Sequence, residues 1–163
     1  LKQKIYFSKM KIREAQPKDI PEIYRLINLL AVFERAGNEV ELTENQLLED
    51  GFGSNPKYKA FVADVQGEIR GMALVYYKYS TWKGLCLHLE DLIVHQNYRG
   101  KGYGKSLLDR VLKLAKDENL KRVDWQVLDW NTPAVEFYES VGAKIEKEWW
   151  SCRLNENGIE SYI

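Results

Sequence analysis

Two spacings of apolar positions recur along the chain, one typical of helices and the other of strands. Helical spacing follows Pro17 and again follows Gly104, at Ile20, Ile23, Leu26, Ile27, Leu30 and Ala31, and at Leu107, Leu108, Val111, Leu112 and Ala115. A short helix is also expected from Thr43 to the residue before Gly51, because residues 43–46 have the form of a capping box. A fourth helix is predicted from about residue 133 to residue 140.

Strand-like apolar segments separate these helices, and they are expected at residues 11–15, 59–65, 68–79, 85–94, 122–127 and 144–153. Gln66 and Gly67 form a tight hairpin turn between the second and third of them. The order predicts an α/β fold: a mixed, mostly antiparallel central sheet flanked by helices, parallel only where a helix crosses over. A length of 163 residues fits one such domain, expected to cover residues 10–163.

A basic, glycine-rich turn joins the strand at residues 85–94 to the helix after Gly104. Gly100, Gly102 and Gly104 let the backbone approach a ligand closely, and the N-terminus of the following helix favours negative charge. The turn therefore predicts a cradle for the pyrophosphate of a phosphorylated cofactor.

Two common phosphate-binding motifs do not match this turn. The dinucleotide motif G-x-G-x-x-G would require glycine where Lys105 stands, and the P-loop motif would require glycine where Arg99 stands. What remains is R-x-x-G-x-G over residues 99–104.

Composition excludes several classes of protein. The 24 basic and 24 acidic residues balance, which argues against binding to duplex nucleic acid, and no apolar run approaches the length of a membrane span. Cys86 and Cys152 each lie in an apolar stretch, which predicts buried thiols in a reducing cytoplasm, and His88 and His95 share no metal-ligand spacing with them. We therefore expect no metal. Residues 1–9 lack the features of a signal peptide and are interpreted as a leader or a native N-terminal arm, with Met10 a candidate start.

Charge is nevertheless distributed unevenly. Basic residues predominate from residue 99 to residue 122, and acidic residues predominate from residue 34 to residue 50. The first region suits a polyanionic cofactor and the second suits a cationic substrate, although ordinary solvated surfaces would give the same pattern.

Several short motifs together resemble the GCN5-related N-acetyltransferase (GNAT) superfamily, and within it the branch of spermidine/spermine and thialysine N-acetyltransferases. Besides R-x-x-G-x-G, the matching segments are Leu42-Thr43-Glu44, Leu47-Leu48-Glu49-Asp50-Gly51-Phe52-Gly53, Leu89-Glu90-Asp91, Tyr98-Arg99-Gly100, Trp130-Asn131 with Pro133, and Phe137-Tyr138. The resemblance covers Met10 to about Arg153. It implies an enzyme that transfers the acetyl group of acetyl-CoA, bound as a co-substrate, to a primary amine of a small cationic substrate by direct attack in a ternary complex.

The resemblance also implies roles for two catalytic residues. Acylation needs a neutral amine, and Glu90 matches the family's base, which partial burial would strengthen. Tyr138 matches the general acid that protonates the leaving thiolate. Strand alternation places His88 on the same face as Glu90, where it would orient a water molecule or serve only in packing.

Cofactor contacts are implied for the backbone at Leu92, Ile93 and Val94, for the loop residues Arg99, Gly100, Lys101, Gly102, Tyr103, Gly104 and Lys105, and for Asn131, Pro133 and Ala134 at the thiol end. The predicted amine pocket contains Glu90 with Phe33, Glu34, Trp82, Asp124, Trp125 and Gln126. Ser80 and Thr81 stand where polyamine acetylators carry an acidic residue and a proline, which leaves smaller amines and thialysine-like amino acids open.

Two other functions remain open from the sequence: acetylation of a protein or peptide, and acyl-CoA sensing without turnover. A homodimer is implied by the branch, whose members pair through C-terminal strands, and Trp149 and Trp150 would suit such an interface or a core.

Overall fold

Residues 10–163 are described by a computed structural model. The predicted leader or arm at residues 1–9 lies outside the described residues. The chain divides into two compact units, one ending at Gln126 and the other comprising Val127–Ile163.

A five-stranded sheet forms the centre of the first unit, in the order β1-β2-β3-β4-β5. The strands are β1 (Met10–Glu14), β2 (Lys59–Val65), β3 (Glu68–Ser80), β4 (Gly84–Val94) and β5 (Val123–Asp124). Neighbouring strands are antiparallel except β4 and β5, which are parallel because α3 (Tyr103–Asp117) crosses over between them. The predicted mixed, mostly antiparallel α/β sheet is thus confirmed.

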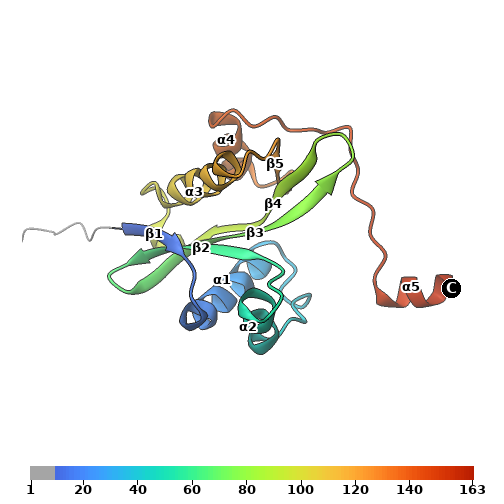
Figure 1. Ribbon diagram of the computed structural model, residues 1–163, viewed down its shortest axis with the longest axis horizontal. Helices are drawn as coiled ribbons and strands as arrows, with labels where there is room; N and C mark the ends of the chain where they lie inside the picture. Colours follow the sequence, from blue (N-terminus) through green and yellow to red (C-terminus); the bar gives the residue numbers. More distant parts are fainter. Residues whose placement is uncertain (1–9) are drawn as a thin grey trace, which may run out of the picture. The chain divides into compact units, whose positions relative to one another are not determined.

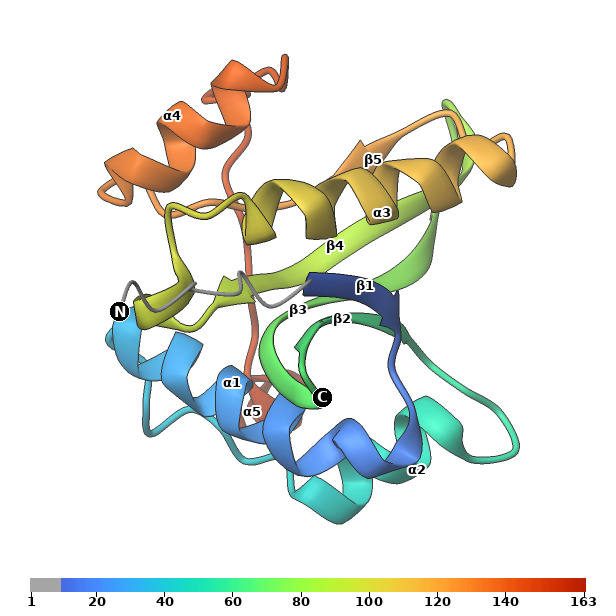
Figure 2. The same ribbon diagram turned by 90° about the vertical axis from the view of Figure 1, so that its left-hand side faces the viewer.

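Helices cover both faces of this sheet. Helices α1 (Ile20–Phe33) and α2 (Glu44–Phe52) lie on one face, and α3 lies on the other (Figures 1 and 2). Side chains of β2 alternate between the two faces of the sheet. Ala60 and Val62 belong to the buried apolar cluster that packs against α1 and α2. The Phe61 ring lies on the other face, where Arg110 of α3 stacks over it. The buried stripe of α3 consists of Leu107, Leu108, Val111, Leu114 and Ala115.

Local signals in the sequence explain most of the element boundaries. A 3₁₀ turn at Pro17–Asp19 precedes α1, and the Thr43 hydroxyl accepts a hydrogen bond from the Gln46 backbone N–H at the start of α2. The helix α2 continues through Gly51 to Phe52, two residues beyond the predicted end. Gln66 and Gly67 both have positive φ, as a two-residue hairpin turn requires.

The second unit contains α4 (Thr132–Ser140) and α5 (Glu156–Tyr162). The helix predicted from about residue 133 is confirmed as α4, but the strand predicted for residues 144–153 is wrong. A strand needs a hydrogen-bonding neighbour, and residues 144–153 pair with none of the five described strands. Cys86 is buried as expected, but Cys152 is exposed because this irregular segment buries little.

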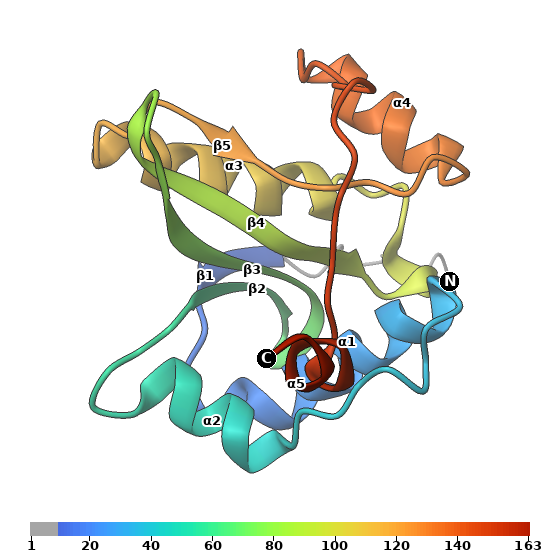
Figure 3. The ribbon, with the colours of Figure 1, turned by 90° about the vertical axis from the view of Figure 1, so that its right-hand side faces the viewer.

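The strand predicted for residues 122–127 shortens to Val123–Asp124. It pairs with β4 only at Leu87 and His88, so residues 125–127 have no ladder to join, and Figure 3 shows β5 as a short arrow beside β4. Pairing between β4 and β5 therefore ends just before the segment of β4 that carries the predicted functional residues from Glu90 onward.

Candidate active site

Strand β4 is paired along its whole length on one side and only briefly on the other. Its neighbour β3 pairs from Gly71 to Ser80, whereas β5 pairs at Leu87 and His88 alone. A β-bulge interrupts the β3–β4 ladder, because Leu74 is opposite Asp91 while Val75 is opposite Leu89. Glu90 is therefore the additional residue of the bulge, and bulges of this kind bend a strand and redirect side chains.

Backbone groups on the open side of β4 can be assigned by alternation. The His95 N–H donates to the Arg70 carbonyl across the β3 side, and the Ile93 carbonyl also lies toward β3, near Gly71. Alternation then directs the backbone groups of Leu92 and Val94 away from β3. This open edge is where a ligand could add its own hydrogen bonds, as predicted for the two residues.

The loop after β4 has the geometry of an anion cradle. Gly100 and Gly102 have φ of 71° and 81°, a left-handed conformation that favours glycine, and Gly102 is the N-cap of α3. No side chain caps that end of the helix. The first N–H groups of α3 and the positive end of its dipole thus face the loop.

Basic side chains of this loop are held in place by local contacts. Arg99 Nε donates to the Val94 carbonyl at 3.0 Å, and its guanidinium carbon lies 5.6 Å from the centre of the Phe33 ring. Lys101 donates to the Asn97 carbonyl, and Lys105 pairs with an acidic residue one turn along α3. Arg99 therefore joins the end of β4, the loop and the end of α1.

Three carboxylates gather beside the bulge: Glu34, Glu90 and Asp91. Burial, together with repulsion from Glu90, raises the pKa of Glu34 above its ordinary value. Burial also raises the pKa of Asp91 to about 7, with further contributions from Glu90 and Glu34. Glu90 itself is 54% exposed. The extra residue of a bulge projects from the ladder, which explains this exposure.

A second polar cluster lies where β4 meets β5. His88 Nδ1 is 2.6 Å from Asp124 Oδ1, and His88 Nε2 is 3.6 Å from Glu90 Oε2. Lys78 and Arg122 also pair with Asp124, at 2.8 and 3.0 Å. Burial opposes ionisation of Asp124, but its hydrogen bonds from Lys78 and His88 prevail and lower its pKa.

Sequence reasoning placed His88 and Asp124 near Glu90 but missed Lys78, Arg122 and Asp91. Their roles depend on which strand residues face one another, a register that no local pattern reveals. For Asp91 a signal existed, because it directly follows Glu90 in a motif already singled out.

Other residues of the predicted amine pocket are more scattered. Trp82 is exposed in the turn between β3 and β4. At a rise of about 3.3 Å per residue, the six steps from Gly84 to Glu90 place this turn roughly 20 Å away from Glu90 along the strand. Trp125 and Gln126 directly follow β5. The structure thus brings Glu34 and Asp124 near the bulge and Phe33 beside Arg99 at the end of β4, but it does not place Trp82 beside the bulge.

The remaining predicted residues belong to the second unit. Asn131 is the N-cap of α4, and its carbonyl accepts hydrogen bonds from the backbone of Ala134 and Val135. Pro133 lies in the first turn, where a missing N–H costs nothing. Tyr138 is buried, and its ring centre is 5.2 Å from that of Phe137.

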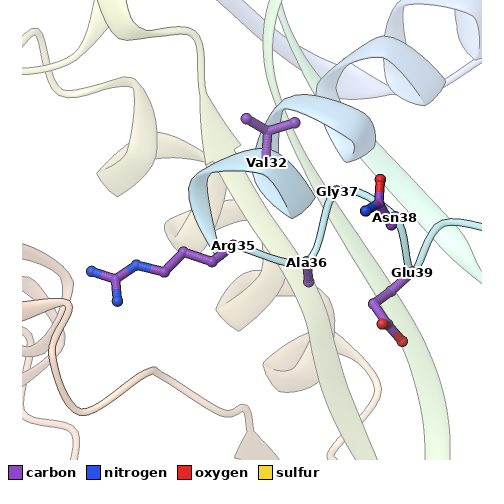
Figure 4. A pocket seen from close by; sticks show the side chains of 6 residues that line it. All are labelled: Val32, Arg35, Ala36, Gly37, Asn38 and Glu39. Carbon is purple, nitrogen blue, oxygen red and sulfur yellow. The ribbon is translucent and has the colours of Figure 1, made fainter.

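Two cavities of the first unit have no predicted site residue in their linings. One of about 260 Å³ follows α1 and is lined by Val32 and residues 35–39; in Figure 4 the Arg35 side chain extends away from Asn38 and Glu39. A larger one, of about 580 Å³, contains the Arg13–Asp19 ion pair. Neither is lined by a predicted site residue, because the predicted site of the first unit lies on the open side of a strand.

Within residues 10–163 no group of histidine, cysteine and acidic side chains is arranged to hold a metal ion. None of the helices described there is long and apolar enough to cross a membrane.

Comparison with known proteins places these features in context. Residues 22–143 match the profile described as the acetyltransferase (GNAT) family. The chain is 39% identical over 151 residues to a thialysine N-epsilon-acetyltransferase of Bos taurus, covering 86% of this chain and 89% of the relative. It is 29% identical over 197 residues to an L-ornithine N5-acetyltransferase of Arabidopsis thaliana, covering 93% and 86%.

Among solved structures, an integron cassette protein from the mobile metagenome of V. cholerae superposes with a TM-score of 0.76 at 23% identity. The match covers 94% of this chain and 96% of that one. Likeness at this identity concerns the fold alone.

Proposed function

This chain belongs to the acetyltransferase (GNAT) family, and from that membership we propose that it acetylates the primary amine of a small cationic substrate. The family is one of N-acetyltransferases that use acetyl-CoA. The finer part of the proposal, the class of acceptor, depends on the residues around the bulge of β4.

The observation that carries this class of acceptor is the group of carboxylates Glu34, Glu90 and Asp91. Burial and repulsion from neighbouring carboxylates raise the pKa of both Glu34 and Asp91. The three side chains therefore repel one another when all are ionised and no cation lies among them. An ammonium group placed among the three would relieve that repulsion. A neutral or acidic acceptor would not.

The names of two relatives agree with this inference. One acetylates the ε-nitrogen of thialysine and the other acetylates N5 of L-ornithine, so both act on side-chain amines of amino acids. We propose an acceptor of that size rather than a long polyamine, since Ser80 and Thr81 leave the β3–β4 turn without an acidic anchor.

The residues of β4 and its loop suit acetyl-CoA. The left-handed glycines and the uncapped N-terminus of α3 would hold the pyrophosphate, with Arg99 and Lys101 beside it. The outward backbone groups of Leu92 and the outward N–H of Val94 would bind the pantetheine arm, and the N–H donors among them would polarise the acetyl carbonyl. In the second unit, Asn131, Pro133 and Ala134 would line the thiol end.

Transfer then requires proton movements at both ends of the reacting group. Glu90, exposed on the bulge, accepts a proton from the amine nitrogen, which must lose one proton before it attacks the thioester carbon and a second one once the C–N bond has formed. The C–N bond forms, the C–S bond breaks, and Tyr138 gives its phenolic proton to the departing thiolate. Glu90 and Tyr138 are thus proposed as the base and the acid.

Assembly as a homodimer also belongs to the proposal. Trp149 and Trp150 are 72% and 89% exposed in a segment without regular structure, and large exposed aromatic side chains mark interaction surfaces. Sedimentation at micromolar concentration should give a dimer, and a monomer there would end this part of the proposal. A cytoplasmic location is likewise proposed, from the free thiols Cys86 and Cys152.

The test is release of free CoA from acetyl-CoA in the presence of thialysine, ornithine, lysine, putrescine, spermidine and short peptides. Turnover of a small amine that is lost in Glu90→Gln would support the proposal. Activity on peptides alone would identify a protein acetylator. Tight binding of acetyl-CoA without turnover of any acceptor would identify a sensor.

A further inference from the structure

Asp124 occupies the centre of the polar cluster between β4 and β5. Lys78 and His88 both contact its Oδ1, at 2.8 and 2.6 Å, and Arg122 contacts its Oδ2 at 3.0 Å. Although burial opposes ionisation, the hydrogen bonds from Lys78 and His88 lower the pKa of Asp124 and favour its carboxylate form. A carboxylate can only accept hydrogen bonds, so its contact with His88 has one possible donor.

This contact determines the tautomer of His88. Because Asp124 accepts, Nδ1 must carry the hydrogen, and the lone pair of the neutral imidazole is then at Nε2. The side chain of His88 is only 14% exposed, and its ring centre is 5.0 Å from that of Tyr76. The imidazole is therefore held in one orientation, with a free proton acceptor directed along β4.

The Nε2 lone pair of His88 faces a second acceptor, the carboxylate of Glu90. His88 Nε2 and Glu90 Oε2 are 3.6 Å apart, which is too far for a direct hydrogen bond. Two acceptors this close are an unfavourable arrangement unless a proton donor lies between them. A single nitrogen can lie at a hydrogen-bond distance of about 2.9 Å from both atoms. The pair is thus arranged to receive two N–H groups from one amine.

Amide formation from an ammonium ion removes two protons from the nitrogen. The first must leave before attack, because a protonated nitrogen has no lone pair. The second leaves from the positively charged nitrogen of the tetrahedral adduct. One exposed carboxylate offers one acceptor for these two steps.

We propose that His88, held by Asp124, is the second proton acceptor at the amine and works beside Glu90. This inference rests on the proposed function. His88 Nε2 takes the first proton and becomes an imidazolium, whose Nδ1–H stays on Asp124. The nitrogen forms its bond to the acetyl carbon, Glu90 takes the second proton, and the C–S bond breaks as the thiolate is protonated by Tyr138. The imidazolium then releases its proton to solvent, and the Glu90 carboxyl returns its proton, by way of solvent, to the Tyr138 phenolate, so that the sum is amide, free thiol and one proton.

In this scheme Asp124 is a positioning residue, because it acts only through His88. The titratable and charged groups around the imidazole are Asp124 of β5, Glu90 of β4, Tyr76 of β3, and Lys78 and Arg122 through Asp124. Histidine is the side chain that ordinarily changes charge at physiological pH, which suits a base that must be regenerated in every turnover.

The experiment compares His88→Asn, Asp124→Asn and the double variant, using the amine that the wild type acetylates fastest. An asparagine at residue 88 can still donate to Asp124 but cannot take a proton. General bases contribute about 10²- to 10⁴-fold, so we expect kcat at pH 7 to fall about 100-fold in His88→Asn, with the KM for acetyl-CoA within twofold of wild type. Asp124→Asn should lower kcat as well, and the double variant should be no slower than His88→Asn.

Chemical rescue supplies a readout that a structural role would not move. Free imidazole added to His88→Gly should restore turnover in proportion to its unprotonated fraction as the pH is varied. Asp117→Asn, which removes a carboxylate from an exposed pair with Lys113 on α3, is the matched control and should keep wild-type kinetics. If His88→Gly does not fold, the kcat values of the asparagine variants still show whether His88 accepts a proton during turnover.

Two results would overturn the inference while leaving the proposed function intact: wild-type kcat in a folded His88→Asn, or additive losses in the double variant. A wild-type protein that acetylates no amine would instead refute the proposed function itself.

Discussion

Gly102 and Gly104 stand two residues apart, one at the N-cap of α3 and the other in its first turn, yet alanine should affect them in opposite ways. Gly102 has a φ of 81°, and a Cβ there would meet no atom within 4 Å, so the cost of alanine is conformational rather than steric. A left-handed conformation costs an L-residue about 1–2 kcal/mol, partly offset by a less flexible unfolded chain. We expect Gly102→Ala to lose about 1 kcal/mol of stability, or about 2–4 °C in Tm for a protein of this size.

Gly104 lies within the first turn of α3, and a Cβ there would meet only Val94 Cγ2, at 3.8 Å. That contact is ordinary, and it lies toward the end of β4 rather than toward the cradle. Replacing a helical glycine with alanine gains about 0.5–1 kcal/mol. Gly104→Ala should therefore raise Tm and leave the affinity for acetyl-CoA unchanged.

Affinity separates the two variants. If Gly102→Ala disturbs the cradle enough to lose one hydrogen bond to a charged oxygen, worth about 1.5–3 kcal/mol, Kd for acetyl-CoA should rise roughly 10- to 150-fold. Calorimetric titration measures Kd, and thermal unfolding without ligand measures Tm. Wild-type affinity in Gly102→Ala, or equal losses of affinity in both variants, would refute the assignment of this loop as the pyrophosphate site.

Three further predictions concern other parts of the chain. Arg13→Met leaves Asp19, which is 5% exposed, without its partner and should cost about 3–5 kcal/mol in denaturant unfolding. Because Arg13 lowers the pKa of Asp19, that deficit should shrink below about pH 4, where the carboxyl becomes protonated; a deficit independent of pH would contradict this account. Asp91 has a raised pKa of about 7 and binds a proton more tightly in the folded chain, so wild-type stability should fall as the pH rises from about 4 to 7. Asp91→Asn should flatten that dependence, and an unchanged pH profile would show that Asp91 is solvated. Tyr138→Phe should lower kcat with little change in the Kd for acetyl-CoA, and lost binding would instead mark Tyr138 as structural.

Elements whose signals are local could be predicted from the sequence. Three such elements are the apolar stripe of α3, the Thr43 cap and the Gln66-Gly67 turn. Each depends on residues a few positions apart, so each could be predicted without knowledge of the rest of the fold. The strand predicted for residues 144–153 failed because a strand also needs a neighbour, and pairing is a long-range property. The same reason shortened β5 to two residues.

For the candidate site, the sequence by itself determined the types of residue and their order: a glycine-rich basic turn before α3, a carboxylate on the preceding strand, and a histidine two positions earlier. Only the tertiary structure decided how they are used. The bulge that exposes Glu90, the open edge at Leu92 and Val94, and the pairing of His88 with Asp124 all follow from strand register. Register is set by how three strands pack together, so distances between residues 36 positions apart in the chain are fixed only when the sheet forms.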